Sequence, residues 1–400
     1  MKAIVLGGGS TMGLALLVYL KDQQDISQIL VTDIQDELIK ERVSWLNDKR
    51  FSAKVLDAAD YNSLVRAIEG YDIVLNTAPT RDKIPVMKAA LKAGANYIDP
   101  GVRQIDEKLS LNGEFNKRGL LAIFDMYYSH GFIDIMAAYG IERLDKTDTL
   151  DLRWAQLDIV PPSEHSRALY TGFNFEGYIF GHYMLPSRRW ENGKMILLPP
   201  RAEPEMFTFK GPIGTQEVRG LAEEGSNLAR LRPEIRKITF KQSLGADLEI
   251  KCKFLADLGV STAPIDIGGG QMVSSWAVIN YLFNNQPTET KKAPDNRHAG
   301  CVIVRGVKDG QKIEYRIDAW PSENLVQKHK DIGCAKVSGP ERAGVFRSGS
   351  PMGSVAVLMA RGQIKAKGAF LPAFTVPSAE FLKQEASMGI SIEITKTEIL

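Results

Sequence analysis

Short apolar runs and longer stretches of helical periodicity alternate along residues 2–124. Strands buried in a parallel sheet form such runs, and the helices that connect them cover both faces of the sheet. The pattern therefore predicts an α/β fold with a doubly wound parallel sheet. The expected strands are Lys2–Leu6, Ile29–Thr32, Ala53–Leu56, Ile73–Asn76, Tyr97–Ile98 and Leu121–Phe124, with helices near 14–21, 36–47, 62–69, 84–93 and 105–118.

A different pattern begins near residue 149. Longer runs alternate polar and apolar residues, which is typical of antiparallel strands with one covered face. Glycine adopts positive φ at no steric cost, so residues 308–310 (Lys-Asp-Gly) predict a hairpin turn. The polar stretch 284–297 is expected to be a surface loop, and the whole region is expected to be α+β. The predicted strands are Thr149–Asp158, Glu205–Lys210, Ile238–Lys241, Asp247–Phe254, Ala299–Val307 and Gln311–Ala319.

Length, composition and charge limit the classes of protein and of partner to be expected. A length of 400 residues favours two domains, and 44% hydrophobic with 24% charged residues is ordinary for a globular protein. A net charge of +2 gives no reason to expect nucleic acid or a membrane surface as a partner. The first strand begins at Lys2 without a leader, and Cys252, Cys301 and Cys334 are far apart, so we expect a cytoplasmic protein without a disulfide framework. No metal site is expected.

A glycine-rich turn carries the main chemical signal. Gly7, Gly9 and Gly13 lie between the first strand and the first helix, in the spacing GxGxxxG. Gly7 allows the tight turn, Gly9 lets backbone approach a pyrophosphate, and Gly13 permits close helix–strand packing. The amides at the helix start then face the phosphates, and Ser10, Thr11 and Met12 are expected to line the same site. This context predicts a Rossmann dinucleotide-binding domain.

An acidic residue at the end of the second strand refines the cofactor prediction. Asp33 would bind the ribose diol and repel a 2′-phosphate, and it is followed directly by Ile34 and not by an arginine, so we favour NAD over NADP. Ile34 is expected to line the same cofactor site. Asp57 and Ala58 are expected near the adenine, although Asp57 is equally consistent with a helix cap. The turn after the fourth strand is expected to line the nicotinamide side; its residues are Asn76, Thr77, Ala78 and Pro79.

The chain resembles the saccharopine dehydrogenase-like family, which includes saccharopine reductase, lysine 6-dehydrogenase and carboxynorspermidine dehydrogenase. The resembling segments are Ala3–Gly13, Val31–Ile34, Leu75–Asp99, Gly131–Ala137 and Gly349–Ala373. The resemblance implies a Rossmann domain interrupted by an inserted substrate-binding and dimerisation domain. Residues 1–128 would form the first domain, residues 129–344 the inserted one, and residues 345–400 would return to the first. It also implies a homodimer and hydride exchange between NAD(P) and a carbon bearing an amine.

Two segments depart from the family pattern. Residues 129–131 (Ser-His-Gly) replace an Asp-Pro before the entry-helix glycine, and residues 241–246 replace an Arg-Tyr-Pro-Gly-His segment. The resemblance therefore leaves the substrate open. Two alternatives remain: an enzyme that uses tightly bound NAD without net redox change, as the related homospermidine synthases do, and a non-catalytic dinucleotide sensor.

Candidate catalytic residues follow the fifth and sixth strands. His130 titrates near neutrality and could exchange the substrate proton, with Asp134 one helical turn later to orient it and Tyr128 beside it. Arg103 could pair with a substrate carboxylate, or it could be an ordinary surface arginine. His130 is equally consistent with a helix-start residue. Possible pocket residues of the second domain are Tyr170, Phe173, His182, Arg188, Arg189, Glu224 and Arg230.

Overall fold

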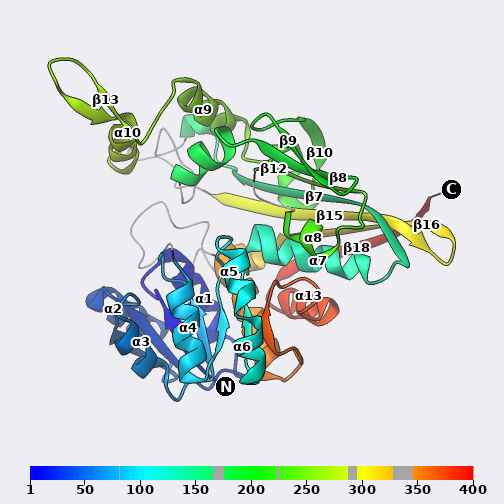
Figure 1. Cartoon of the computed structure of the whole chain (residues 1–400). Coiled ribbons are helices and arrows are strands. Elements are labelled where there is room, and N and C mark those ends of the chain that lie inside the picture. Colours follow the sequence, from blue (N-terminus) through cyan, green and yellow to red (C-terminus); the bar gives the residue numbers. More distant parts are fainter. Residues whose placement is uncertain (81, 165–174, 223–225, 287–294, 328–345, 400) are drawn as a thin grey trace. The chain divides into compact units, whose positions relative to one another are not determined.

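The computed structural model describes the chain except for residues 81, 165–174, 223–225, 287–294, 328–345 and 400 (Figure 1). The chain forms two compact units. Unit 1 comprises Met1–Tyr139 and Val345–Gly389, and unit 2 comprises Gly140–Gly344 and Ile390–Leu400. The predicted domains placed all of residues 345–400 in the first domain, whereas here the last eleven residues belong to unit 2.

Unit 1 is built on a seven-stranded sheet in the order β17-β6-β5-β4-β1-β2-β3. Every neighbouring pair is parallel. Strand order reverses between β1 and β4, which creates the crevice where such sheets bind ligands. The doubly wound sheet predicted from the apolar runs is confirmed. Its strands are β1 (Lys2–Leu6), β2 (Gln28–Asp33), β3 (Phe51–Val55), β4 (Ile73–Asn76), β5 (Asn96–Ile98), β6 (Leu121–Ile123) and β17 (Gly368–Phe370).

Helices connect these strands, and a late helix packs back onto the first one. A Cβ on Gly349 or Gly353 would come within 2.3 Å of α1 atoms, so the two helices touch through glycine. The close approach of α12 to α1 therefore depends on glycine at these two positions. The helices are α1 (Thr11–Lys21), α2 (Asp36–Leu46), α3 (Tyr61–Ile68), α4 (Ile84–Ala93), α5 (Ile105–Ser110), α6 (Asn112–Lys117), α12 (Phe346–Ala360) and α13 (Ser378–Ser387).

Unit 2 contains a nine-stranded mixed sheet. Its main path runs β10-β11-β12-β7-β15-β16-β18, with β8 and β9 attached beside β12, and the β12–β7 pair is parallel. The predicted hairpin turn is present, with Asp309 and Gly310 both at positive φ. The strands are β7 (Lys146–Asp158), β8 (Ser187–Glu191), β9 (Lys194–Leu198), β10 (Glu205–Thr208), β11 (Thr215–Gly220), β12 (Lys237–Ser243), β15 (Asn296–Lys308), β16 (Gln311–Pro321) and β18 (Ile390–Ile399).

The predicted strand Asp247–Phe254 is wrong. These residues lie in helix α9 (Ala246–Asp257). Leu248, Cys252 and Leu255 recur at helical spacing and pack into one apolar cluster, while apolar residues also occupy the opposite side. Two apolar stripes on one helix produce a short alternating run that periodicity cannot tell from a strand.

Two other segments differ from the sequence-based expectations. Helix α10 (Ser275–Asn284), which the apolar pattern did not single out, precedes the predicted surface loop, and β15 begins within that loop. The final strand β18 pairs antiparallel with β16, so the tail adds to the sheet of unit 2. A helical turn η3 (Gly177–Tyr183), helix α8 (Ser226–Leu231) and the hairpin β13 (Pro264–Asp266) and β14 (Met272–Ser274) complete unit 2 as described here. Among the described helices, none is long and apolar enough to cross a bilayer.

Candidate functional site

The glycine-rich turn has the geometry that a dinucleotide requires. Gly7 adopts φ +75°, and a Cβ on Gly13 would lie 2.3 Å from the Gly7 carbonyl oxygen. Ser10 caps helix α1, because its side-chain oxygen accepts a 2.9 Å hydrogen bond from the Gly13 amide. Thr11 and Met12 form the first turn of α1 and are partly exposed. The turn therefore brings backbone close to where a phosphate would sit at the start of a helix.

Arg42 supports this turn and was not found from the sequence. It lies on α2 and is buried, and its guanidinium donates to the carbonyl oxygens of Gly8 and Ser10 at 2.9 and 2.7 Å. These bonds hold the carbonyl groups of the turn toward α2. The Arg42 guanidinium is therefore part of the structural support of this turn. A lone arginine on a helix carries no sequence signal for this role.

Asp33 lies where a ribose-binding carboxylate is expected. One of its oxygens accepts a 3.0 Å hydrogen bond from the Gly9 amide, and a Cβ on Gly9 would come 2.7 Å from that oxygen. Ile34, next along the chain, is 66% exposed, and Val55 on the neighbouring strand is also exposed. Exposed apolar side chains beside this carboxylate would suit a purine ring. Glycine at position 9 thus lets the Asp33 carboxylate approach the backbone of the turn.

Asp57 and Ala58 follow the third strand. Asp57 is exposed, and its carboxylate accepts a 2.8 Å hydrogen bond from the Ala59 amide, as in a local turn. This contact agrees with the alternative that the sequence left open, in which Asp57 shapes the loop. Contact with the adenine stays a prediction for both residues.

The turn after β4 lies against the glycine turn, and its polar side chains face inward. Asn76 is fully buried, donates to Tyr97 at 2.9 Å and accepts from the Ala78 amide. Thr77 donates to the carbonyl oxygens of Leu6 and Gly7. A Cβ on Gly7 would lie 2.5 Å from Ala78, so backbone of the two turns is in close contact. Asn76 and Thr77 therefore hold the strand ends together, and Pro79 is exposed beside them.

Lys83 is a buried cation at this edge of the sheet. Its ammonium donates to the Ala78 carbonyl oxygen and lies 3.4 Å from the Thr80 hydroxyl. Burial lowers the pKa of Lys83 to about 8, opposed by attraction to Asp99 and reinforced by repulsion from Lys108. A lysine that titrates near neutral pH suits proton transfer. Site residues in such folds follow the carboxyl ends of the parallel strands. Lys83 lies in the loop that follows β4, so its position in the sequence could have identified it.

A fully buried ion pair underlies the same edge. Asp99 accepts from Lys108 at 2.9 Å, from Tyr97 at 2.8 Å and from the Gly101 amide at 2.5 Å. These contacts explain physically why the segment that resembles the family carries a tyrosine two residues before an aspartate. Arg103, in the following loop, is exposed, so its proposed pairing with a substrate carboxylate stays a prediction.

The segment after β6 brings a histidine and a carboxylate together. Asp125, at φ +62° and fully buried, lies 3.8 Å from Nδ1 of His130. Asp125 lies just after β6 (Leu121–Ile123), where site residues are expected in such a sheet. Its position in the sequence could therefore have identified it as a candidate together with Asp134. His130 belongs to a π-helical turn η1 (Tyr128–Phe132) that leads into α7 (Ile133–Ile141), and such turns often occur at functional sites.

Two of the candidates near His130 are buried. The Tyr128 ring is 1% exposed and stacks on Phe132 with 4.4 Å between ring centroids, and Phe132 meets Phe381 edge-on. Tyr128 is therefore packed against Phe132, and its catalytic role stays a prediction. Asp134 is 4% exposed on α7.

The second-domain candidates are dispersed. Tyr170, Phe173 and Glu224 lie outside the described residues. Arg189 forms ion pairs with Glu191 and Glu203, while Arg188 and Arg230 are exposed and His182 is partly exposed in η3.

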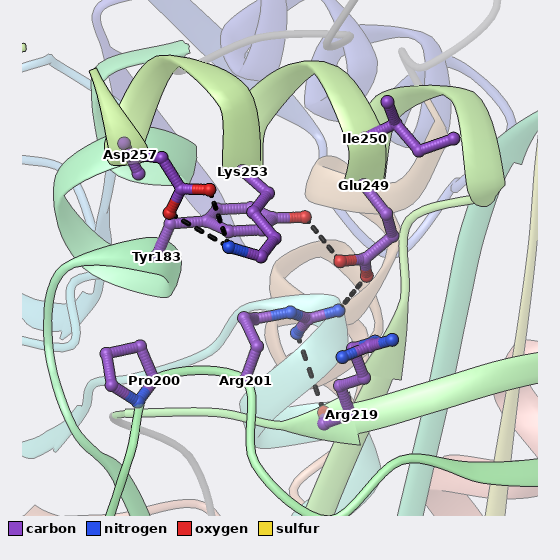
Figure 2. Close-up of a pocket in the computed structure, with 9 residues that line it drawn as sticks. Tyr183, Pro200, Arg201, Arg219, Glu249, Ile250, Lys253 and Asp257 are labelled. Atoms are coloured by element: carbon purple, nitrogen blue, oxygen red, sulfur yellow. Dashed lines mark hydrogen bonds and ion pairs between the residues drawn. The ribbon is translucent and has the colours of Figure 1, made fainter.

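A cavity of about 320 Å³ in unit 2 is lined by other residues, seen in Figure 2. Its cations have carboxylate partners: Arg201 pairs with Glu249, and Lys253 pairs with Asp257 at 2.6 Å. Tyr183 also donates to Glu249. The cavity thus has its charges largely neutralised.

Comparison with known proteins agrees with this geometry. Residues 3–123 match the family described as saccharopine dehydrogenase NADP binding domain. The chain is 20% identical over 400 residues to the carboxyaminopropylagmatine dehydrogenase of Synechocystis sp., a match that covers 97% of this chain and 96% of that protein. The solved structure of apo saccharopine dehydrogenase (L-Glu forming) from Saccharomyces cerevisiae aligns over 100% of both chains, with a TM-score of 0.75 and 12% identity.

The family match lies within unit 1, whereas the relative and the solved structure align over both units, and the solved structure shares the fold. The predicted family resemblance and the predicted architecture of a Rossmann domain with a second, mixed-sheet domain are confirmed. The cofactor class is NAD(P). The chain is therefore similar to saccharopine dehydrogenase-like proteins over its whole length, and residues 3–123 match the saccharopine dehydrogenase NADP binding domain family.

Proposed function

We propose that the protein is an NAD(P)-dependent dehydrogenase that exchanges hydride at a CH–NH centre of an amino acid or related amine. The observation that carries this proposal is the dinucleotide-binding turn, with a buried lysine of lowered pKa held against it through Ala78. Both named relatives are dehydrogenases, one of carboxyaminopropylagmatine and one of saccharopine. Those two secondary amines are the first substrates to test.

The residues present would hold the cofactor along the carboxyl edge of the sheet. The amides that follow Gly9 would face the pyrophosphate, Asp33 would bind the ribose diol, and Ile34 would contact the adenine. The nicotinamide ring, once bound there, supplies the hydride acceptor or donor. Asp33 supports NAD, because a carboxylate repels the 2′-phosphate of NADP. Direct titration with both cofactors decides this choice.

The protein must also move a proton. When the amine is oxidised, its carbon loses a hydride and its nitrogen loses a proton as the C=N bond forms. Lys83 in its neutral form can accept that proton, and in its charged form it can return it during reduction. A pKa of about 8 makes both forms available near neutral pH. His130, backed by Asp125, is the second candidate for this role.

A steady-state assay of nicotinamide absorbance tests the function and the two proton-transfer candidates together. We expect turnover with at least one secondary amine, and a Lys83→Met variant should lose the limb of the kcat/KM profile near pH 8. A profile that His130→Gln changes and Lys83→Met leaves unchanged would assign the role to His130. Bound cofactor without absorbance change for any amine, amino acid or 2-oxo acid would contradict the proposal. Retention of both limbs in both variants would refute the assignment of residues only.

A homodimer in the cytoplasm, expected from the resemblance and from cysteine usage, belongs to the same proposal. Cys252 and Cys301 are buried free thiols, and burial raises the pKa of Cys252 to about 12. Buried thiols of high pKa are inert toward oxidation, which suits a protein without structural disulfides.

A further inference from the structure

The cavity of unit 2 lies between one helix and the segments that face it. Helix α9 forms one wall, and the loop after β9 and strand β11 form the other (Figure 2). Small-molecule sites have volumes of about 300–1,000 Å³. The volume of this cavity, about 320 Å³, therefore suits a ligand of amino-acid size. Five of the lining residues are charged: Arg201, Arg219, Glu249, Lys253 and Asp257.

A buried ion pair fixes the inner part of the cavity. The Arg201 side chain is 4% exposed, pairs with Glu249 and donates to the Gln242 carbonyl oxygen at 2.9 Å. Tyr183 donates to the other oxygen of Glu249, and the Arg201 guanidinium lies 5.6 Å from the centroid of the Tyr183 ring. Arg201 and Glu249 thus cancel each other's charge and hold the inner wall in one arrangement.

The conformation of Arg201 is unfavourable for folding. Its backbone has φ +55°, in the left-handed region that residues other than glycine rarely adopt. Its Nε is buried and has no hydrogen-bond partner in the described part of the chain. Strained backbone and unsatisfied buried donors both lower stability, and they are concentrated at functional sites. The geometry of Arg201 therefore supports a function for this cavity.

The other charges of the cavity belong to more exposed ion pairs. Lys253 pairs with Asp257 one turn along α9, and these side chains are 66% and 63% exposed. Arg219 pairs with Glu217, two residues away on the same strand, and is 33% exposed. Ion pairs near the surface add little stability, so a ligand can replace them at small cost.

The charges that a ligand can reach define its chemistry. Glu217 is not a lining residue, so with both exposed pairs open the walls present two cations, Arg219 and Lys253, and one carboxylate, Asp257. In Figure 2, Lys253 and Asp257 extend from α9, and Arg219 extends from the facing strand. A molecule with two anionic groups and one cationic group is complementary to this set. Small α-amino dicarboxylic acids carry these three charges.

We propose that the cavity binds a small amino dicarboxylic acid, with Arg219 and Lys253 on its two carboxylates and Asp257 on its ammonium group. The planar guanidinium of Arg219 can donate two parallel hydrogen bonds to one carboxylate, and Lys253 serves the other as a compact charge. None of these residues belongs to the dinucleotide-binding turn. This inference does not rest on the proposed dehydrogenase activity.

Isothermal titration calorimetry of the full-length protein with L-aspartate, in the absence of nicotinamide cofactor, tests the proposal. Arg219→Gln should raise the dissociation constant at least about 10-fold, because a charged two-pronged contact is lost. Arg232→Gln is the matched control and should leave the constant unchanged: Arg232 is also 33% exposed and pairs with Glu234 two residues away, but it does not line the cavity. Unchanged thermal unfolding would show that both variants fold.

A second matched pair tests the other wall. Lys253 and Lys251 each pair with an aspartate one turn away on α9, and only Lys253 lines the cavity. Lys253→Gln should weaken binding of L-aspartate about 10-fold, whereas Lys251→Gln should leave it unchanged.

Analogues of the probe separate the contacts. Succinate lacks the ammonium group and L-asparagine lacks one carboxylate, so each should bind wild type at least about 10-fold more weakly than L-aspartate does. Asp257→Asn removes the carboxylate that would face the ammonium group. This variant should therefore lose the preference for L-aspartate over succinate and keep the preference over L-asparagine.

Three results would overturn the proposal. The first is the absence of saturable binding of L-aspartate and of L-glutamate at millimolar concentration. The second is binding that Arg219→Gln, Lys253→Gln and Asp257→Asn all leave unchanged, which would place the amino acid elsewhere. The third is inorganic phosphate that binds as tightly as L-aspartate, which would make the cavity a general anion contact. Absence of dehydrogenase turnover with the binding intact would concern the proposed function alone.

Discussion

The carboxyl edge of the sheet in unit 1 and the exposed sides of helices α9 and α10 in unit 2 use their side chains in opposite ways. At the sheet edge, Lys108 pairs with Asp99, Asn76 donates to Tyr97, and these side chains are buried. On α9 and α10, large apolar side chains such as Phe254 and Tyr281 are exposed. Buried paired charges organise a site in advance, whereas exposed apolar groups indicate a surface that a partner covers.

Removal of a buried ring and removal of an exposed ring in unit 2 should change the free energy of unfolding by very different amounts. This is the largest difference that we expect. Phe175 is 4% exposed and stacks on Phe283 with 4.3 Å between centroids, so Phe175→Ala should lower the free energy of unfolding by about 3–5 kcal/mol. Phe254→Ala, on the exposed side, should change it by less than about 0.5 kcal/mol in the monomer. Urea unfolding of dilute protein measures both. Equal losses would mean that Phe254 is already covered within the monomer.

A buried carboxyl in unit 1 should make stability depend on pH. Burial raises the pKa of Glu385 from 4.5 to about 7, although hydroxyls of Ser354 and Ser350 donate to it. The folded state thus binds its proton more tightly than the unfolded state. The stabilisation is complete below pH 4.5 and is lost as pH rises through 7, by about 3 kcal/mol.

Substitution of that carboxyl tests the pH dependence. Glu385→Gln should flatten the stability profile between pH 4.5 and 7 and should leave the variant the more stable protein at pH 8. Glu380→Gln, on the same helix, is the control and should keep the wild-type profile. Chemical unfolding at several pH values measures the difference. A wild-type profile that stays flat in this window would show that Glu385 is ionised in the folded protein.

A methyl group at the glycine turn should weaken cofactor binding. The Cβ of Gly13→Ala would lie 2.3 Å from the Gly7 carbonyl oxygen, and overpacking of this kind costs about 2 kcal/mol, or about a 30-fold rise in Kd. Gly113→Ala is the control, since nothing lies within 4 Å of its Cβ position. Fluorescence titration with NADH gives both constants. Equal affinity in the two variants would move the dinucleotide away from this turn.

Removing the carboxylate beside the turn should change the choice of cofactor by a smaller factor. Asp33→Asn should raise the affinity for NADPH relative to NADH by about 10-fold, because the 2′-phosphate no longer faces a negative charge. The ratio of the two dissociation constants is the measurement. An unchanged ratio would mean that Asp33 does not contact the ribose, in spite of its bond to the Gly9 amide.

Candidate catalytic residues show where sequence reasoning was incomplete. His130 and Arg103 were chosen because they follow strands, and the same rule applies to Lys83 and Asp125. Lys83 and Asp125 are distinguished by their surroundings in the folded protein. Lys83 is buried near Asp99, which changes its pKa, and Asp125 lies close to His130 with its backbone at positive φ. Burial and proximity depend on how separate segments pack, which no single segment encodes.

Local constraints were visible in the sequence by itself. Apolar runs of strand length, the glycines of the first turn and Asp33 at its strand end determined a doubly wound sheet and its dinucleotide site, because glycine geometry and strand burial act over a few residues. Tertiary structure alone decided that 247–254 is helical, that the tail joins the second sheet, that Tyr128 is buried and that Lys83 is held against the glycine turn. Those outcomes depend on which apolar face finds a partner far away in the chain, and that is a property of the packed molecule.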